Sequence, residues 1–270
     1  MASLPSGVYR ACLEQDGESP LECIADQLEA GENQLIEEIN TWLLILAAAL
    51  IFFMQAGFAM LCAGSVRLKN VANTMLKNLL DACGAAIGFF TVGYAFSFGA
   101  GTDATTFIGY QNFLMRGVES NAFWLFEFAF AATSATIVAG TLAERCQMAA
   151  YLCYSVVLTG FLYPVVAHAV WSTNGFISST NADPFLGIGM VDFAGSGVVH
   201  MTGGATAVFA TMILGPRKGR FYDARGNPLP KPKPFPGHSV ALQVSVPIYP
   251  PLPCVVFVVF VLVSRAESKC

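Results

Sequence analysis

The stretch that decides the fold is INTWLLILAAALIFFMQAGFAMLCAGSV, residues 39–66, which contains no charged side chain. A helix needs ~20 apolar residues to cross the ~30 Å hydrocarbon core of a bilayer, so this stretch is long enough to span a membrane. The whole composition agrees, because 55% of the residues are hydrophobic and the mean hydropathy is +0.58. Only 12% are charged, against roughly 25% in an ordinary soluble domain. The sequence therefore predicts a membrane protein.

Four further apolar runs are long enough to span, and only the second of them contains an acid, Glu127. These runs cover residues 82–102, 121–143, 147–170 and 193–214. The pattern predicts an all-α fold, a polytopic membrane bundle of five transmembrane helices. It divides the chain into an acidic N-terminal segment (1–38), a membrane domain (39–214), a polar loop leading into a sixth helix (215–243) and a tail (244–270).

Basic residues predict the orientation of the bundle, because Lys and Arg accumulate in cytoplasmic loops. If the N-terminus is outside, only Arg10 and Arg116 lie on the outer side. The inner side then holds Arg67, Lys69, Lys77, Arg145, Arg217, Lys218, Arg220, Arg225, Lys231 and Lys233. We therefore predict that the N-terminus is outside and that the loop 215–243 is cytoplasmic. Residues 1–38 lack the basic and apolar regions of a signal peptide, so we expect no cleavage there.

Two classes of function are disfavoured by composition. The chain carries a net charge of -4 and has no basic stripe that could neutralise a phosphate backbone, so we expect no nucleic-acid partner. Its eight cysteines show no metal-binding spacing. Four of them lie in or beside apolar runs, where cysteine behaves as a small buried hydrophobe.

Polar side chains inside membrane spans are costly, so the few that occur here are candidate functional residues. His168 and Trp171 close the fourth span, and Asp192 opens the fifth. His200 lies about 12 Å further along that helix, at a rise of about 1.5 Å per residue. Each also has an ordinary structural explanation, since tryptophan often marks the membrane interface and aspartate often caps a helix.

Two phenylalanines in the third span, Phe126 and Phe130, are one helical turn apart and therefore share a face. A pair of this kind is usually a core or lipid-facing contact. At the depth of Trp171 and Asp192, however, the pair could also line a binding site.

Four segments together resemble the ammonium transporter family, which includes the Rhesus proteins. They are FEFAFAATSATIVAGTLAER (126–145), AHAVW (167–171), DFAGSGVVHMTGG (192–204) and GPRKGRF (215–221). The likeness runs from about Thr41 to Gln243 and is greatest to the eukaryotic and cyanobacterial members.

The resemblance implies a homotrimer in which each subunit has its own narrow pore, built from two inverted five-helix halves and a final long helix. This chain is similar to the first half. Trp171 and Phe130, with Phe126, would recruit ammonium by cation-π attraction, and Phe130 would also belong to a phenyl gate. Asp192 would brace this region through hydrogen bonds to backbone, and His200 would be the first of two histidines lining the channel.

The resemblance also implies a transporter rather than an enzyme, with ammonium or ammonia as substrate, no cofactor and a multi-pass location that we expect to be the plasma membrane. One departure lies inside the match, because many relatives have an amide where this chain has Glu127.

A second departure follows Gln243, where the similarity stops within an element and the chain continues VSVPIYPP. Nine of its 14 prolines lie in residues 228–253, and no helix tolerates that density. Val244 and Ser245 can be encoded by GTGAGT, which matches the usual start of an intron. We therefore expect the tail to be a translated intron or a gene-model error. On this interpretation the 270-residue product does not conduct by itself.

Two other functions remain open at this level. The chain could be a non-conducting truncated isoform or a regulatory subunit that joins full-length trimers. It could also be a haem-binding membrane protein in which His168 and His200 are the axial ligands.

Overall fold

The computed structural model describes residues 20–99, 105–223 and 225–244. Within these ranges it contains helices and isolated bridges but no strand. Five helices are long and apolar enough to cross a membrane: Cys23–Ser65, Leu68–Phe98, Asn121–Leu142, Met148–Trp171 and Ser196–Leu214. The predicted bundle of five membrane helices is therefore confirmed. Of the predicted end segments, residues 1–19 and 245–270 lie outside the described part of the chain.

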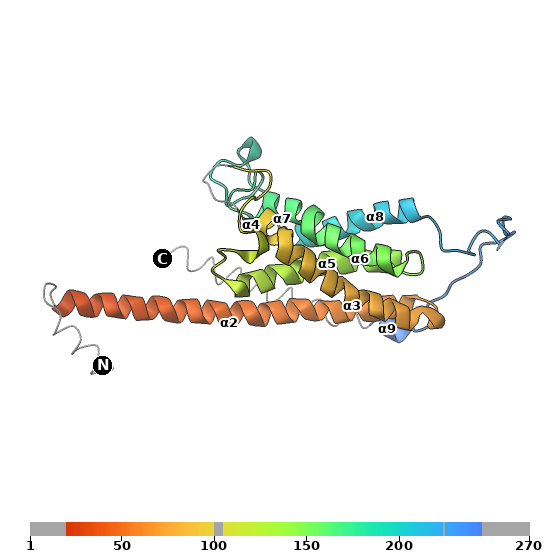
Figure 1. Cartoon of the computed structure of the whole chain (residues 1–270), viewed down its shortest axis with the longest axis horizontal. Helices are drawn as coiled ribbons and strands as arrows, with labels where there is room; N and C mark the ends of the chain where they lie inside the picture. The colour runs from red at the N-terminus through yellow and green to blue at the C-terminus, as the bar shows by residue number, and fades with distance from the viewer. Residues whose placement is uncertain (1–19, 100–104, 224, 245–270) are drawn as a thin grey trace.

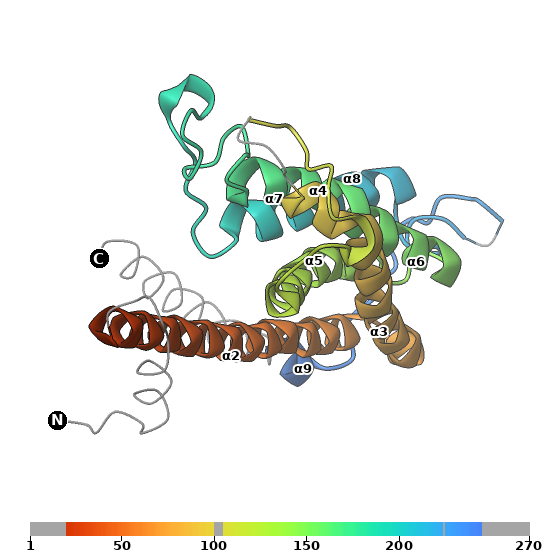
Figure 2. The same cartoon turned by 60° about the vertical axis from the view of Figure 1, so that its left-hand side comes forward.

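The first helix, α2 (Pro20–Ser65), starts much earlier than the predicted span. It is continuous for 46 residues, or about 69 Å at a rise of about 1.5 Å per residue. Its N-terminal part projects beyond the other helices (Figures 1 and 2). The hydropathy pattern placed the start at Ile39 because the preceding residues are acidic. Good helix formers such as Glu, Gln, Leu and Ala nevertheless continue the helix back to Pro20, and proline is favourable at a first helical position.

The second membrane helix also begins before its predicted start at residue 82. It is formed by η1 (Leu68–Asn70), α3 (Val71–Gly88), η2 (Phe89–Gly93) and α4 (Tyr94–Phe98). Lys77 and Asp81, which the hydropathy pattern excluded, lie inside the helix and are buried. Each has a partner in the protein, because Lys77 donates to the carbonyl of Cys146 at 2.6 Å and Asp81 Oδ2 accepts from the Tyr151 hydroxyl at 2.7 Å.

The three remaining helices lie within three residues of their predicted limits. The third is α5 (Asn121–Leu142). Ser120 caps its N-terminus, because the Ser120 hydroxyl accepts a hydrogen bond from the Phe123 amide. The fourth consists of α6 (Met148–Val157), η4 (Leu158–Leu162) and α7 (Tyr163–Trp171), and the fifth of η6 (Ser196–Met201) and α8 (Thr202–Leu214). Helix α5 is the central element, and its small residues, such as Ala131 and Ala135, are fully buried.

Three of the membrane helices contain a π-helical segment, namely η2, η4 and η6. The segments η2 and η4 face each other across a close helix contact. A Cβ atom at Gly88 would lie 2.7 Å from both the Thr159 hydroxyl and the Val156 carbonyl oxygen. The helices can approach this closely only because glycine occupies the position, as small residues do in membrane bundles.

The end of the bundle opposite Trp171 is held by a buried carboxylate, Glu144, in the turn between α5 and α6. Its side chain is 1% exposed and forms ion pairs of 3.0 Å with Arg67 and with Arg217. It also accepts hydrogen bonds from the Arg67 amide and the Asn70 side chain. Burial raises the pKa of Glu144, but these hydrogen bonds and the Arg217 charge outweigh burial and hold the pKa below its ordinary value. Glu144 therefore ties three separate loops together.

The loop after α8 extends away from the bundle and returns to the end of α2 (Figure 1). There a short helix, α9 (Val240–Val244), packs against α2. The side chain of Gln243 donates to the Gly64 carbonyl at 3.0 Å, and the His238 amide donates to the Val66 carbonyl at 3.2 Å. These bonds fasten the returning chain to α2.

Candidate functional site

The predicted site residues Trp171 and Asp192 are in direct contact. Trp171 is the last residue of α7, and Asp192 lies in the loop before η6. The indole Nε1 of Trp171 donates to Asp192 Oδ2 at 3.1 Å. This bond joins the end of the fourth membrane helix to the start of the fifth and fixes the indole plane.

The other carboxylate oxygen of Asp192 is bonded to the beginning of η6. Asp192 Oδ1 accepts from the Gly197 amide at 2.6 Å and from the Ser196 hydroxyl at 3.2 Å. The loop reaches this position through left-handed backbone at Ala194 (φ 56°) and Gly195 (φ 75°). Gly195, rather than Asp192, is thus the capping residue of the helix. The aspartate still satisfies a free amide of the first turn, where negative charge is favourable.

Phe126 and Phe130 extend the site from Trp171 into the bundle. The ring centroids of Phe130 and Trp171 are 5.5 Å apart at 66°, and those of Phe126 and Phe130 are 5.1 Å apart at 87°. Both phenylalanines are buried. We call Phe126, Phe130 and Trp171 the outer aromatic cluster, in which each ring presents an edge to the face of the next.

His200 lies apart from these contacts. It is on η6, and its amide donates to the Gly195 carbonyl at 3.0 Å, but its side chain is exposed. Asp192 lies within electrostatic range of its imidazole. The neighbouring surface of η6 and α8 is also uncovered, with apolar side chains 57–83% exposed at Met201, Val208, Phe209, Met212 and Ile213.

His168 holds the outer loops instead of facing a ligand. It is fully buried; its Nδ1 donates to the Ser97 carbonyl and its Nε2 accepts from the Thr106 hydroxyl, both at 2.8 Å. Neither ring nitrogen is left for a metal, which argues against the haem interpretation. The described ranges contain no group of three or more His, Cys, Asp or Glu side chains placed to hold a metal ion.

Sequence reasoning missed a polar cluster around Asp81. This carboxylate accepts from Tyr151 at 2.7 Å and from Tyr154 at 3.4 Å, and the Ser155 hydroxyl donates to its backbone carbonyl at 3.0 Å. A signal was present, because residues 151, 154 and 155 have the i, i+3, i+4 spacing of one helix face.

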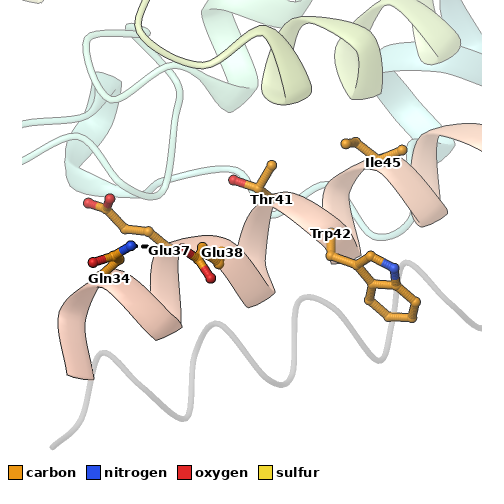
Figure 3. A pocket seen from close by; sticks show the side chains of 6 residues that line it. All are labelled: Gln34, Glu37, Glu38, Thr41, Trp42 and Ile45. Atoms are coloured by element: carbon orange, nitrogen blue, oxygen red, sulfur yellow. Dashed lines mark hydrogen bonds between the residues drawn. The ribbon is translucent and has the colours of Figure 1, made fainter. Parts of the chain in front are cut away.

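An open hollow on α2 is separate from the site. It is lined by Gln34, Glu37, Glu38, Thr41, Trp42 and Ile45, which all belong to this one helix (Figure 3). Within it, Gln34 donates to Glu38 at 2.9 Å. No residue of the outer aromatic cluster contributes to it.

Comparison with known proteins assigns the family. Residues 41–243 match the model of the Ammonium Transporter Family. This chain belongs to the Ammonium Transporter Family. The family consists of membrane transporters rather than enzymes, so the chain is a multi-pass membrane protein.

Individual relatives agree with this assignment. The chain is 45% identical over 217 residues to Ammonium transporter 1 member 3 of Solanum lycopersicum, covering 79% of this chain and 45% of the relative. It is 46% identical over 220 residues to Ammonium transporter Amt2 of Archaeoglobus fulgidus, with the same coverage. The chain therefore spans about half the length of the curated relatives that it matches.

Solved structures show the same fold. A Sensor Amt Protein is 31% identical, with a TM-score of 0.65 over 78% of this chain and 52% of the other. The G343C mutant of Candida albicans Mep2 is 27% identical, with a TM-score of 0.62 over 78% of this chain and 45% of the other.

Proposed function

We propose that this chain forms the outer recruitment site and the first half of the pore of an ammonium transporter. Ammonium binds at the outer aromatic cluster, and ammonia passes His200. The observation that carries the proposal is the hydrogen bond between Trp171 and Asp192, which holds the indole against the Phe130 ring.

The cluster has the chemistry that a small cation requires. Aromatic faces attract a cation by roughly 0.5–2 kcal/mol, most strongly for tryptophan and where water is excluded. Asp192 adds negative charge beside the indole, while its hydrogen bonds to Gly197 and Ser196 keep it from moving onto the cation.

Charge and hydration then require a proton to leave before the substrate moves further. Transfer of an ion into hydrocarbon costs tens of kcal/mol in a Born estimate, whereas neutral ammonia avoids that cost. A histidine in an apolar channel supplies a hydrogen-bond partner and can carry the proton. His200 has this role in our proposal.

The distribution of Lys and Arg supports an N-terminus outside the membrane and loop 215–243 in the cytoplasm. We place the protein in the plasma membrane as a homotrimer, in line with the family resemblance.

The exposed face of η6 and α8 implies that the pore needs a second half. His200 lies on this face beside uncovered apolar side chains such as Met201. The same observation favours a second candidate function, in which the chain joins related transporters as a non-conducting subunit through this face. Co-purification with a full-length relative tests that alternative.

The transport proposal is tested by fusing residues 1–243 to the second half of the Archaeoglobus relative and measuring methylammonium uptake in yeast that lacks ammonium transporters. Trp171→Leu should weaken apparent affinity roughly 2- to 30-fold, which corresponds to the loss of one cation-π contact. Trp42→Leu is the matched control, because Trp42 is an exposed tryptophan of α2.

Asp192→Ala should abolish uptake, because the indole and the start of η6 lose their common anchor. Asp183→Ala, at an exposed aspartate of the same loop, should leave uptake unchanged. Wild-type uptake by the Asp192→Ala fusion would refute the assigned role.

A further inference from the structure

The loop that leaves α8 (blue in Figure 1) is strongly basic, although the whole chain carries a net charge of -4. Residues 215–233 contain six Lys or Arg and only one acid, Asp223. They follow directly after Leu214, the last residue of α8, so the positive charge is concentrated where a membrane helix ends. Clusters of roughly 4–8 basic residues in this position favour binding of acidic phospholipids.

Two contacts fix the base of the loop at the Glu144 end of the bundle. On the outgoing arm, Arg217 pairs with Glu144 at 3.0 Å. On the returning arm, the Arg67 guanidinium lies 4.0 Å from the centroid of the Phe235 ring, and Arg67 is itself paired with Glu144 at 3.0 Å. Both arms are therefore held at the level where α5 ends.

Backbone hydrogen bonds join the two arms to each other. The Leu229 amide donates to the Phe221 carbonyl at 2.7 Å, and the Lys233 amide donates to the Arg220 carbonyl at 2.8 Å. The second of these bonds brings basic residues of the two arms together. The loop therefore presents its positive charge on a defined backbone close to the end of the bundle.

The charge of this loop is available to a partner. Its three lysines, which we call the loop lysines, are all exposed: Lys218, Lys231 and Lys233. Both ion pairs in the described ranges are made by Glu144, so no described acid pairs with a loop lysine. The carboxylate of Asp223 is held by its own turn, because its Oδ1 accepts from the Arg225 and Asn227 amides, both at 2.8 Å.

Aromatic side chains lie beside these cations. An open hollow of about 580 Å³ on the outgoing arm is lined by Lys218, Phe221 and Tyr222, among others. Phe221 and Tyr222 are 40% and 54% exposed. Aromatic rings are favoured at the membrane interface, where one end of a lipid is polar and the other apolar. A free phosphate or an acidic peptide would use the charges of the loop but not the rings, so the combination favours a lipid.

We infer that this loop is a docking surface for acidic phospholipids in the leaflet at the Glu144 end of the bundle. The loop lysines attract the phosphate headgroups, and Phe221 and Tyr222 contact the less polar region beside them. Each Lys or Arg close to an anionic surface improves binding about fivefold, so three of them give a preference of up to roughly 100-fold at low salt. The assignment to the cytoplasmic leaflet rests on the proposed orientation, whereas the lipid binding does not.

Native mass spectrometry of the purified 270-residue chain in a neutral detergent tests the inference without any transport. The probes are phosphatidylserine and phosphatidylcholine with the same acyl chains. Phosphatidylserine should bind at least about tenfold more tightly, and the preference should shrink as the ionic strength rises.

Replacing all three loop lysines with Gln should remove this preference. Replacing them with Arg should keep it, because the charge is unchanged, and this variant controls for any effect of the substitutions on the fold. Arg116→Gln, at an exposed arginine before α5 and therefore at the opposite end of the bundle, should also keep it.

A second measurement places the lipid at the loop and leaves every charge intact. Tyr222→Trp adds a tryptophan at an exposed position. Brominated phosphatidylserine should quench the added fluorescence more strongly than brominated phosphatidylcholine does. Inorganic phosphate should not displace the lipid, because it has no apolar part to contact the rings.

Equal binding of the two lipids by the wild-type chain would overturn the inference. An unchanged preference in the Gln variant would also overturn it, because the lysines would then serve only to orient the chain in the membrane. Displacement of phosphatidylserine by inorganic phosphate would likewise refute it, since the loop would then be a site for soluble anions.

Discussion

Replacing Glu144 with Gln tests whether one buried carboxylate holds the inner loops together. The substitution keeps the size of the side chain and one accepting oxygen but removes the charge that pairs with Arg67 and Arg217. Hydrogen bonds to charged partners contribute roughly 1.5–3 kcal/mol each, against about 0.5–1.5 kcal/mol for neutral ones. Replacing two charged hydrogen bonds by neutral ones therefore lowers the free energy of unfolding by about 2–3 kcal/mol.

Solvent reduces this figure. The Arg67 and Arg217 side chains are 30% and 18% exposed, so water can partly replace the lost partner. We therefore expect a loss of about 2 kcal/mol in the free energy of unfolding. At roughly 2–4 °C per kcal/mol, the thermal midpoint should fall by about 4–8 °C.

The assay is thermal unfolding of the detergent-solubilised chain, followed by tryptophan fluorescence. Glu29→Gln, at an exposed glutamate of α2, is the matched control and should leave the midpoint unchanged. A double-mutant cycle with Arg217→Gln should give a coupling of about 1 kcal/mol. A Glu144→Gln midpoint equal to wild type, or zero coupling, would refute the reasoning.

Three further predictions concern pH, packing and topology. In the folded protein the pKa of Glu144 lies below its ordinary value of 4.5. The stability that the ionised carboxylate adds to the fold is therefore complete above pH 4.5 and is lost as the pH falls through the folded-state pKa. The thermal midpoints of wild type and Glu144→Gln should converge below about pH 4.5. Gly88→Ala should destabilise the chain by about 1–3 kcal/mol, because its Cβ would meet Thr159 and Val156 at 2.7 Å. Gly31→Ala on α2, where an added Cβ would meet no atom within 4 Å, should instead stabilise the chain by up to about 1 kcal/mol. The thermal unfolding midpoint checks both glycine variants. An impermeant thiol reagent applied to intact cells should label Phe185→Cys but not Tyr222→Cys, and labelling of position 222 would contradict the orientation.

Hydropathy predicted where the chain crosses a membrane but not where its helices begin. The apolar run 147–170 predicted the fourth membrane helix, Met148–Trp171, to within one residue, because the apolar segment and the helix have the same length there. They differ in the first two helices. The helix around Lys77 and Asp81 is stabilised by Cys146 and Tyr151, about 70 positions away, and no local pattern reports such distant partners.

The sequence predicted which residues belong to the candidate site but not how they are arranged. Trp171, Asp192 and the two phenylalanines were singled out because polar and aromatic groups at one membrane depth are unusual. The bond between Trp171 and Asp192, however, depends on left-handed backbone at Ala194. Alanine carries no signal for that conformation, so the path of the loop could not be foreseen.

The π-helical segments have a consequence for how this chain tolerates changes in length. A π turn contains one residue more than the α turn it replaces, so η2 amounts to an insertion within an otherwise α-helical span. Deleting Val92 would allow an ordinary α-helix in which four residues replace the present five, so the residues beyond would keep nearly their present orientation. Ser97 would then still face His168, whereas a one-residue deletion within the α-helical part α3 would rotate Ser97 by about 100°. A deletion scan should therefore find residues 89–93 the most tolerant part of the second membrane helix, because removing a single codon there relaxes the local backbone and keeps the outer loops connected.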